Sequence, residues 1–130
     1  AVGDIDNDGD LDLVISNLDQ PPNVMKNNSI GNLNNWLNVK LIGSTCNYSA
    51  IGSLLILTAG NMRQIREVRS GSSYLSQSDL RLHFGLGNYS VVDLEVRWPN
   101  GQREEFRGVG SNQFIKIIEG EEHLQHIEIQ

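Results

Sequence analysis

Residues 4–12, Asp-Ile-Asp-Asn-Asp-Gly-Asp-Leu-Asp, hold the strongest chemical signal in the sequence. Their carboxylates belong to Asp4, Asp6, Asp8, Asp10 and Asp12. Calcium takes six to eight oxygen ligands, mostly carboxylates and carbonyls, from a flexible loop. If the segment curls, the first three carboxylates point at one centre, and Gly9 permits the sharp turn. The backbone carbonyl of Asp10 and the carboxylate of Asp12 then close the shell, so the sequence predicts a calcium site.

An EF-hand does not explain this loop. It would place a Glu at the twelfth loop position, which is Ile15 here, and a helix would follow. Residues Leu11–Asn17 are instead apolar and typical of a strand. A solvated acidic turn without an ion remains the alternative.

The negative charge of the chain is concentrated near this loop. The net charge is −6, with 16 acidic and 10 basic residues, and six of the acids precede the first basic residue, Lys26. The rest of the chain is balanced, which favours a local cation site. Nucleic acid is not an expected partner because a basic stripe is missing. No apolar run approaches the length of a membrane span, and the single Cys46 rules out an internal disulfide framework.

The elements expected to position these residues are almost all strands. In residues 92–98, apolar side chains alternate with charged ones, which predicts a half-buried strand. Pro99-Asn-Gly101 is a turn signal, whereas Asp19-Gln-Pro-Pro-Asn23 predicts a break. Further strands are expected at 37–41, 53–59, 63–69 (an edge strand), 82–84, 102–107, 114–118 and 124–129. We therefore predict an all-β fold, an antiparallel β-sandwich from residue 34 onward, with the Asn-rich segment 26–35 as a linker.

A second candidate site is the polar segment 69–79. Tyr74, Ser76 and Gln77 would contact a sugar or peptide there. The alternative is a long connection between strands whose polar side chains bond their own backbone.

Other chemically capable residues have a structural interpretation. His83 should face away from its apolar neighbours in a strand, and His123 and His126 should lie on opposite faces and share no metal. Trp98 lies on an apolar face and is expected in the core, whereas Trp36 stays open between packing and a sugar platform.

A hydrolase is the weakest functional interpretation, and it would depend on paired glutamates. The pairs are 104–105 and 121–122, and adjacent residues on a strand diverge, so neither pair is an obvious acid–base couple.

The acidic loop also resembles a known repeat. Gly3-Asp-Ile-Asp-Asn-Asp-Gly-Asp-Leu-Asp-Leu-Val14 is similar to the FG-GAP (VCBS) repeat of integrin-type β-propellers, and Asn23–Asn28 is similar to the strand that ends such a repeat. The resemblance implies calcium binding by the loop. It also implies that residues 1–30 form part of one propeller blade, with the remaining blades upstream.

The rest of the chain resembles the ASPIC/UnbV domain. The motifs are Asn35-Trp-Leu, Ile51-Gly, Arg66-Glu-Val68, Gly71, Tyr74-Leu-Ser-Gln-Ser78, His83-Phe-Gly-Leu-Gly87 and Val96-Arg-Trp-Pro-Asn-Gly101. That domain typically follows FG-GAP repeats in secreted proteins similar to cartilage acidic protein, and it has no established catalytic activity. The resemblance assigns residues 34–130 to this domain.

Together these observations predict a non-enzymatic, calcium-binding structural or interaction module. It would form the C-terminal part of a larger secreted or cell-envelope protein and meet an extracellular protein or glycan. A carbohydrate-binding module that uses the Tyr74/Gln77 loop is the alternative.

Overall fold

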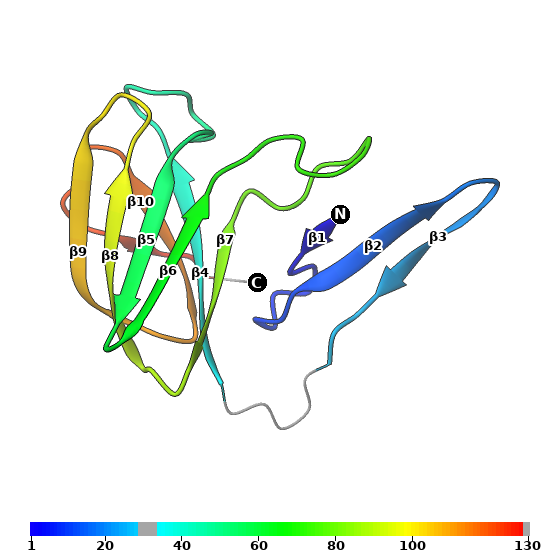
Figure 1. Cartoon of the computed structure of the whole chain (residues 1–130), viewed down its shortest axis with the longest axis horizontal. Coiled ribbons are helices and arrows are strands. Elements are labelled where there is room, and N and C mark those ends of the chain that lie inside the picture. Colours follow the sequence, from blue (N-terminus) through cyan, green and yellow to red (C-terminus); the bar gives the residue numbers. More distant parts are fainter. Residues whose placement is uncertain (29–33, 129–130) are drawn as a thin grey trace.

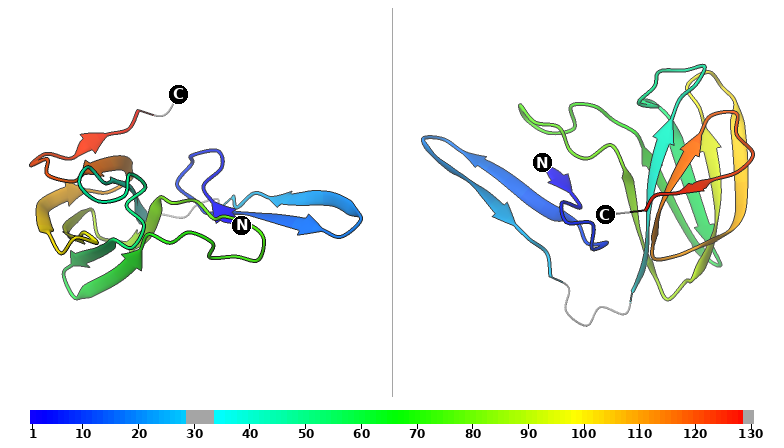
Figure 2. Two further views of the ribbon diagram at one scale, coloured as in Figure 1. Left: turned by 90° about the horizontal axis from the view of Figure 1, so that it is seen from above. Right: turned by 180° about the vertical axis from the view of Figure 1, so that it is seen from behind.

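The computed structural model describes residues 1–28 and 34–128 and contains three β-sheets (Figure 1). Two four-stranded sheets form a sandwich, and a three-stranded sheet stands beside it (Figure 2). The described residues contain no helix, and hence none that is long and apolar enough to cross a membrane. The predicted all-β sandwich is confirmed.

The small sheet contains the N-terminal strands in the order β1-β2-β3. They are β1 (Val2–Gly3), β2 (Asp12–Asn17) and β3 (Gln20–Met25). The acidic loop connects β1 to β2. The break predicted at residues 19–23 is shorter than expected: a turn at Leu18 and Asp19 separates β2 from β3, but β3 then runs through Pro21 and Pro22. Proline lacks an N–H, and β3 is an edge strand, so an outward-facing proline breaks no ladder.

The sandwich has one sheet in the order β11-β10-β4-β7 and another in the order β6-β5-β8-β9. The first consists of β4 (Asn35–Ile42), β7 (Leu82–Gly87), β10 (Gln113–Ile118) and β11 (Gln125–His126). The second consists of β5 (Leu54–Ala59), β6 (Met62–Glu67), β8 (Val91–Arg97) and β9 (Arg103–Gly110). The edge position predicted for residues 63–69 is confirmed by β6.

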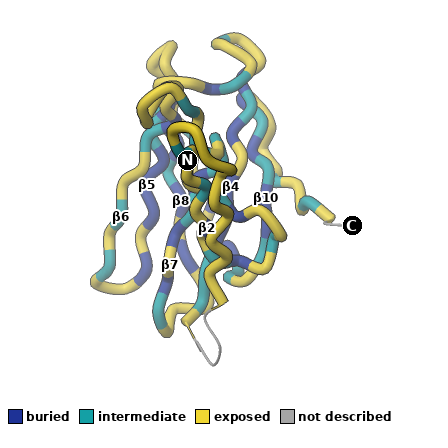
Figure 3. The backbone as a smooth tube through the Cα atoms, turned by 90° about the vertical axis from the view of Figure 1, so that its right-hand side faces the viewer, coloured by how far each residue is buried: buried dark blue, intermediate teal, exposed yellow. Residues whose placement is uncertain are grey.

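The core lies between these two sheets because each strand turns alternate apolar residues inward. Figure 3 shows buried and exposed positions alternating along the strands. The largest fully buried side chains are Phe84, Leu37, Leu55, Leu57, Leu86, Leu94, Ile115, Ile117, Val39, Val68, Val92 and Val96. Trp98 is buried with them, as predicted.

One strand pair departs from the antiparallel pattern. Strand β10 runs parallel to β4, with Ile115 beside Val39 and Ile117 beside Leu41. The other pairs of the sandwich are antiparallel. A parallel pair needs a long crossover connection, and here β5 to β9 supply it. The chain therefore returns from the second sheet to pair with the strand on which the sandwich began.

The ends of two predicted elements can be compared with the structure. The turn at Pro99–Gly101 is confirmed: Gly101 donates to the Trp98 carbonyl over 2.9 Å, and its φ is 90°. The strand predicted at 124–129 is shorter than expected, because β11 covers Gln125–His126 and residue 129 lies outside the described residues. Part of the expected linker 26–35, residues 29–33, also lies outside them.

Candidate metal site

The acidic loop gathers three carboxylates. One oxygen each from Asp4, Asp6 and Asp8 lies within 4.8 Å of the others. Oxygens that share a calcium ion at about 2.4 Å can be at most about 4.8 Å apart, so the spacing fits one such ion. Among residues 1–28 and 34–128 this is the group of acidic, His or Cys side chains close enough to hold a metal.

The loop curls because two of its residues adopt left-handed backbone conformations. Asn7 has φ 59° and Gly9 has φ 95°, and asparagine and glycine tolerate this region best. The curl turns the N–H groups of Asp8 and Gly9 onto the two carboxylate oxygens of Asp4, each over 3.1 Å. The N–H of Asp10 donates to Asp8 Oδ1 over 2.9 Å. Peptide N–H groups thus hold the first and third carboxylates in place.

The site combines a buried carboxylate with two exposed ones. Asp4 is 2% exposed, and burial raises its pKa, with the charge of Asp8 adding to the effect. Hydrogen bonds from the loop backbone and the charge of Arg81 act in the opposite direction. Lys26 forms an ion pair with Asp6, which lowers the pKa of Asp6 and raises that of Lys26. One lysine supplies one positive charge to three carboxylates, which leaves the cluster acidic.

Asp12 lies outside this group of three. Its side chain is 2% exposed, and its oxygens accept hydrogen bonds from the N–H groups of Ile5 and Asn27, each over 2.9 Å. It therefore ties the start of the loop to the residues after β3. Asp10, within the loop, is half-buried and is likewise not in the group.

Arg81, just before β7, fastens the loop to the sandwich. Its Nη2 donates to the Asp4 carbonyl and its Nη1 to Asn7 Oδ1, both over 2.7 Å. Its Nε pairs with Asp79 over 2.5 Å, and its guanidinium carbon lies 5.4 Å from the centre of the Phe114 ring. All three nitrogens of the guanidinium are therefore used, in a planar arrangement that lysine cannot reproduce.

Gly9 lies against two side chains of the outer face of the sheet β11-β10-β4-β7. His83 Nε2 is 2.8 Å from the Gly9 carbonyl oxygen. The Trp36 ring fills the space where a Cβ of residue 9 would be, with Cζ2 at 2.6 Å from that position. The ring also meets Phe114 edge-on at 4.9 Å. Trp36 is therefore a packing residue of the junction, and His83 is hydrogen-bonded on the face opposite the core, as predicted.

The small sheet makes a second contact through β1. The N–H of Asp79 donates to the Val2 carbonyl over 2.9 Å, and the N–H of Val2 donates to Ser78 Oγ over 3.2 Å. The chain before β7 thus covers the edge of β1 that faces away from β2 (Figure 1).

The segment 69–79 forms an extended arm. Ser73 and Ser76 pair across its tip, where Tyr74 is 90% and Leu75 is 88% exposed. The Gln77 amide is used inside the arm: it accepts from the Gly71 N–H and donates to the Ser78 carbonyl, each over 2.8 Å. This bonding supports the interpretation of the arm as a self-bonded connection. The arm tip and the start of β4 lie far apart, so Tyr74 and Trp36 do not form one platform (Figures 1 and 2).

The remaining candidates do not gather into a second centre. His123 and His126 are exposed and are not in the acidic group. The paired glutamates line one shallow hollow. There Glu104 accepts from the Gly120 N–H over 2.7 Å, and Glu105 pairs with Arg107 over 3.1 Å.

Comparisons with known proteins match both parts of the chain. The model of the family described as ASPIC and UnbV matches residues 43–124, more than half of the chain. The chain is 32% identical over 122 residues to cartilage acidic protein 1 of Mus musculus, covering 92% of this chain and 19% of that protein. The identity to the Homo sapiens protein is also 32%, with 92% and 18% covered. For Xenopus tropicalis it is 35% over 105 residues, with 78% and 16% covered. The chain thus spans under a fifth of the length of these relatives.

Proposed function

The chain belongs to the ASPIC and UnbV family, and from that premise we propose that it is a calcium-binding structural module of a longer extracellular protein. The observation that carries the proposal is the group of three carboxylates within 4.8 Å, in a loop that is bonded to the sandwich. Calcium would hold the small sheet against the sandwich and perform no chemistry. The cartilage acidic protein relatives support the extracellular setting.

The electrostatics of the loop support a divalent ion. Two like charges about 4 Å apart repel by about 4 kcal/mol at an effective dielectric constant near 20. Lys26 is shared between two of the carboxylates, and burial of the third raises its pKa. A calcium ion would replace repulsion with attraction and would be ligated by these oxygens together with peptide carbonyls and water. Asp10 and Asp12 would act around this ion as positioning residues.

The loop's attachment explains what the ion would do for the fold. Asp4 is both a candidate ligand and, through its carbonyl, an acceptor for Arg81. Gly9 follows directly after the ligand Asp8 and carries the contacts to Trp36 and His83. Fixing the carboxylates therefore fixes the peptide groups that dock on the sandwich.

The small sheet fits the end of an FG-GAP repeat. It is an antiparallel sheet in which the acidic loop joins two neighbouring strands, β1 and β2. We assign residues 1–30 to such a repeat and residues 34–130 to the ASPIC/UnbV domain, with the sandwich as a non-enzymatic interaction module.

Calcium titration of the whole chain by calorimetry, together with thermal unfolding, tests the proposal. We expect calcium to raise the Tm, because a ligand at one hundred times its Kd stabilises the folded state by about 2.7 kcal/mol. The double variant Asp6→Asn/Asp8→Asn should lose both the heat and the Tm rise. Asp19→Asn removes an exposed aspartate of the β2–β3 turn and should keep both. No calcium-dependent change in the unmodified chain at millimolar calcium would refute the site.

The exposed Tyr74 ring supports a second candidate function, the binding of a glycan at the arm tip. Tyr and Trp side chains commonly supply such contact area. A glycan array with the chain and Tyr74→Ala would support this role if Tyr74→Ala abolished a signal seen with the unmodified chain, and the absence of any signal would contradict it.

A further inference from the structure

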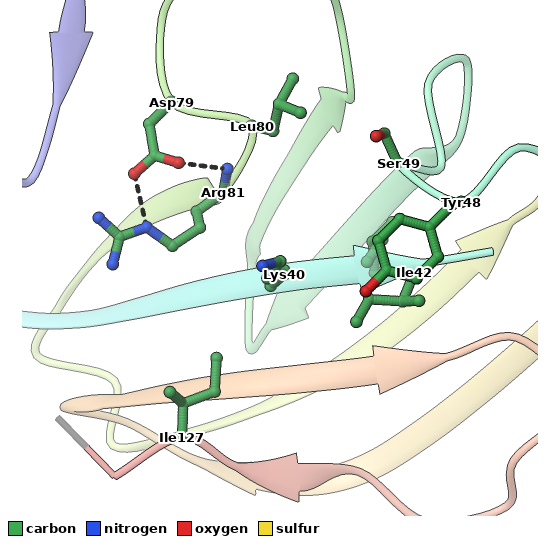
Figure 4. A pocket seen from close by; sticks show the side chains of 9 residues that line it. Lys40, Ile42, Tyr48, Ser49, Asp79, Leu80, Arg81 and Ile127 are labelled. Carbon is green, nitrogen blue, oxygen red and sulfur yellow. Dashed lines mark hydrogen bonds and ion pairs between the residues drawn. The ribbon is translucent and has the colours of Figure 1, made fainter.

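A hollow of about 490 Å³ lies on the outer face of the sheet β11-β10-β4-β7. This volume is in the range of small-molecule sites. Figure 4 shows Lys40 in its middle, between the Asp79–Arg81 pair and the side chains of Tyr48 and Ile42, with Ile127 on a third side. The walls thus come from β4, the loop after it, the segment before β7 and the C-terminal segment.

The cations at this hollow outnumber the acids. Lys40 lies beside Lys116 of the neighbouring strand β10 in the parallel register. Within residues 1–28 and 34–128 neither lysine has an acidic partner. Arg81 also lines the hollow and is paired there with Asp79. Lys116 is outside the lining of the hollow, whereas Lys40 is inside it. In a chain of net charge −6, Lys40 is thus a cation inside a hollow without an acidic partner among the described residues, which favours an anionic group on the ligand.

The other walls are mostly apolar. Ile42, Leu80 and Ile127 present aliphatic side chains to the hollow, and Tyr48 adds an exposed aromatic ring. Apolar walls around a few polar or charged groups are the usual form of a small-molecule site, in which those groups fix the orientation of the ligand. A fully hydrated inorganic anion would leave these walls uncovered.

We propose that this hollow binds a small organic carboxylate with an apolar body. The carboxylate pairs with the Lys40 ammonium, and the body lies against Ile42, Tyr48 and Ile127. The site is separate from the three carboxylates of the acidic loop, so it does not depend on calcium binding.

Octanoate, below its micelle concentration, is the probe, and two-dimensional NMR of the labelled chain is the measurement. We expect octanoate to shift the amide signals of residues 40–42, 48–49 and 127 in a saturable way. Octanamide has the same body without the charge, and acetate has the charge without the body. Each should bind at least about tenfold more weakly, since a charge-assisted hydrogen bond and several buried methylenes are each worth that factor or more.

Variants of the two lysines separate a site from general attraction of anions. Lys40→Met keeps the aliphatic stem and should weaken octanoate binding by about tenfold or more, while Lys40→Arg should restore most of it. Lys116→Met is the matched control, because Lys116 is outside the lining of the hollow, and it should weaken binding by less than about threefold. Equal losses in the two Met variants, equal binding of octanoate and acetate, or shifts confined to other residues would each overturn the proposal.

Discussion

The substitution Gly9→Ala tests two effects at one position: the backbone strain of residue 9 and the overlap of its new Cβ with the Trp36 ring. The backbone of Gly9 has φ 95°, which costs an L-residue about 1–3 kcal/mol. A Cβ there would also lie 2.6 Å from Cζ2 of Trp36 and closer still to Cε2 and Nε1 of the same ring. The ring also contacts Phe114 edge-on, so moving it away from residue 9 would disturb a second packing contact.

The cost of the overlap with Trp36 cannot exceed the free energy that the loop gains by docking on the sandwich. The Gly9→Ala loop relieves the overlap by lifting from the ring, and it then loses the His83 hydrogen bond to the residue 9 carbonyl. That bond contributes about 1 kcal/mol, and the apolar contact with Trp36 adds about 1–2 kcal/mol. We therefore expect Gly9→Ala to destabilise the chain by about 4 kcal/mol, of which about 2 kcal/mol is backbone strain.

A double-mutant cycle measures the two parts. Urea unfolding followed by circular dichroism, at fixed calcium, is compared for the unmodified chain, Gly9→Ala, Trp36→Leu and the double variant. The smaller side chain removes the overlap but not the strain, so the cycle should give a coupling energy of about 2 kcal/mol. Gly71→Ala is a matched control for strain alone, since Gly71 has φ 67° and no atom near its Cβ position. It should cost about 1 kcal/mol.

The outcome that would refute this reasoning is additivity. If Gly9→Ala lowers the free energy of unfolding by the same amount in the Trp36→Leu background as in the unmodified chain, the Trp36 ring does not hold the loop in place. A red shift of tryptophan emission in the Gly9→Ala single variant would independently report a more exposed Trp36, because Trp98 is buried and changes little.

Three further substitutions test other parts of the chain. Glu119 is 3% exposed and accepts hydrogen bonds from residues 44–46 and from an asparagine side chain. Burial raises its pKa, but these bonds outweigh burial and hold the pKa well below its usual range, so its stabilisation is present at neutral pH and is lost as pH falls below about 4. Glu119→Gln should lower the free energy of unfolding by about 3 kcal/mol at pH 7, and a Tm unchanged at pH 7 would contradict this. Asp12→Asn should cost about 2 kcal/mol with or without a chelator, whereas a loss seen only with calcium present would make Asp12 a ligand. Leu75→Gly should stabilise by about 0.5 kcal/mol, because Leu75 has φ 48° and glycine relieves that strain; Tyr74→Gly, beside it, should destabilise in the same urea titration.

The sequence predicted the features that depend on near neighbours in the chain. Alternation in residues 92–98 identified β8 and the burial of Trp98, and the residues around Gly9 identified the curl of the acidic loop. The strand through Pro21 and Pro22 was missed because proline is read as a break, and only the position of β3 at a sheet edge makes it acceptable.

The junction was not predicted because its partners are far apart in the sequence. Arg81 and His83 bond residues 74 to 77 positions away, and no local pattern marks such pairs. The same applies to Asn38, a polar residue of β4 that is buried between Phe114 and His83 on the face where the loop docks. A covered outer face can be recognised only when the sheet order is known.

The parallel pairing of β4 with β10 determines when this chain can fold during its synthesis. The β5–β6 and β8–β9 hairpins join strands close in sequence and can form early. Strand β4 can pair with β7 earlier, but its other edge waits for β10, and residue 118 must leave the ribosome before that pairing is complete. Trp36, Arg81 and His83 lie on or just before strands of that late sheet. The acidic loop is synthesised before the sandwich, but its contact surface is complete only when Phe114 of β10 has joined Trp36 and Arg81. Its final docking is therefore among the last steps of folding.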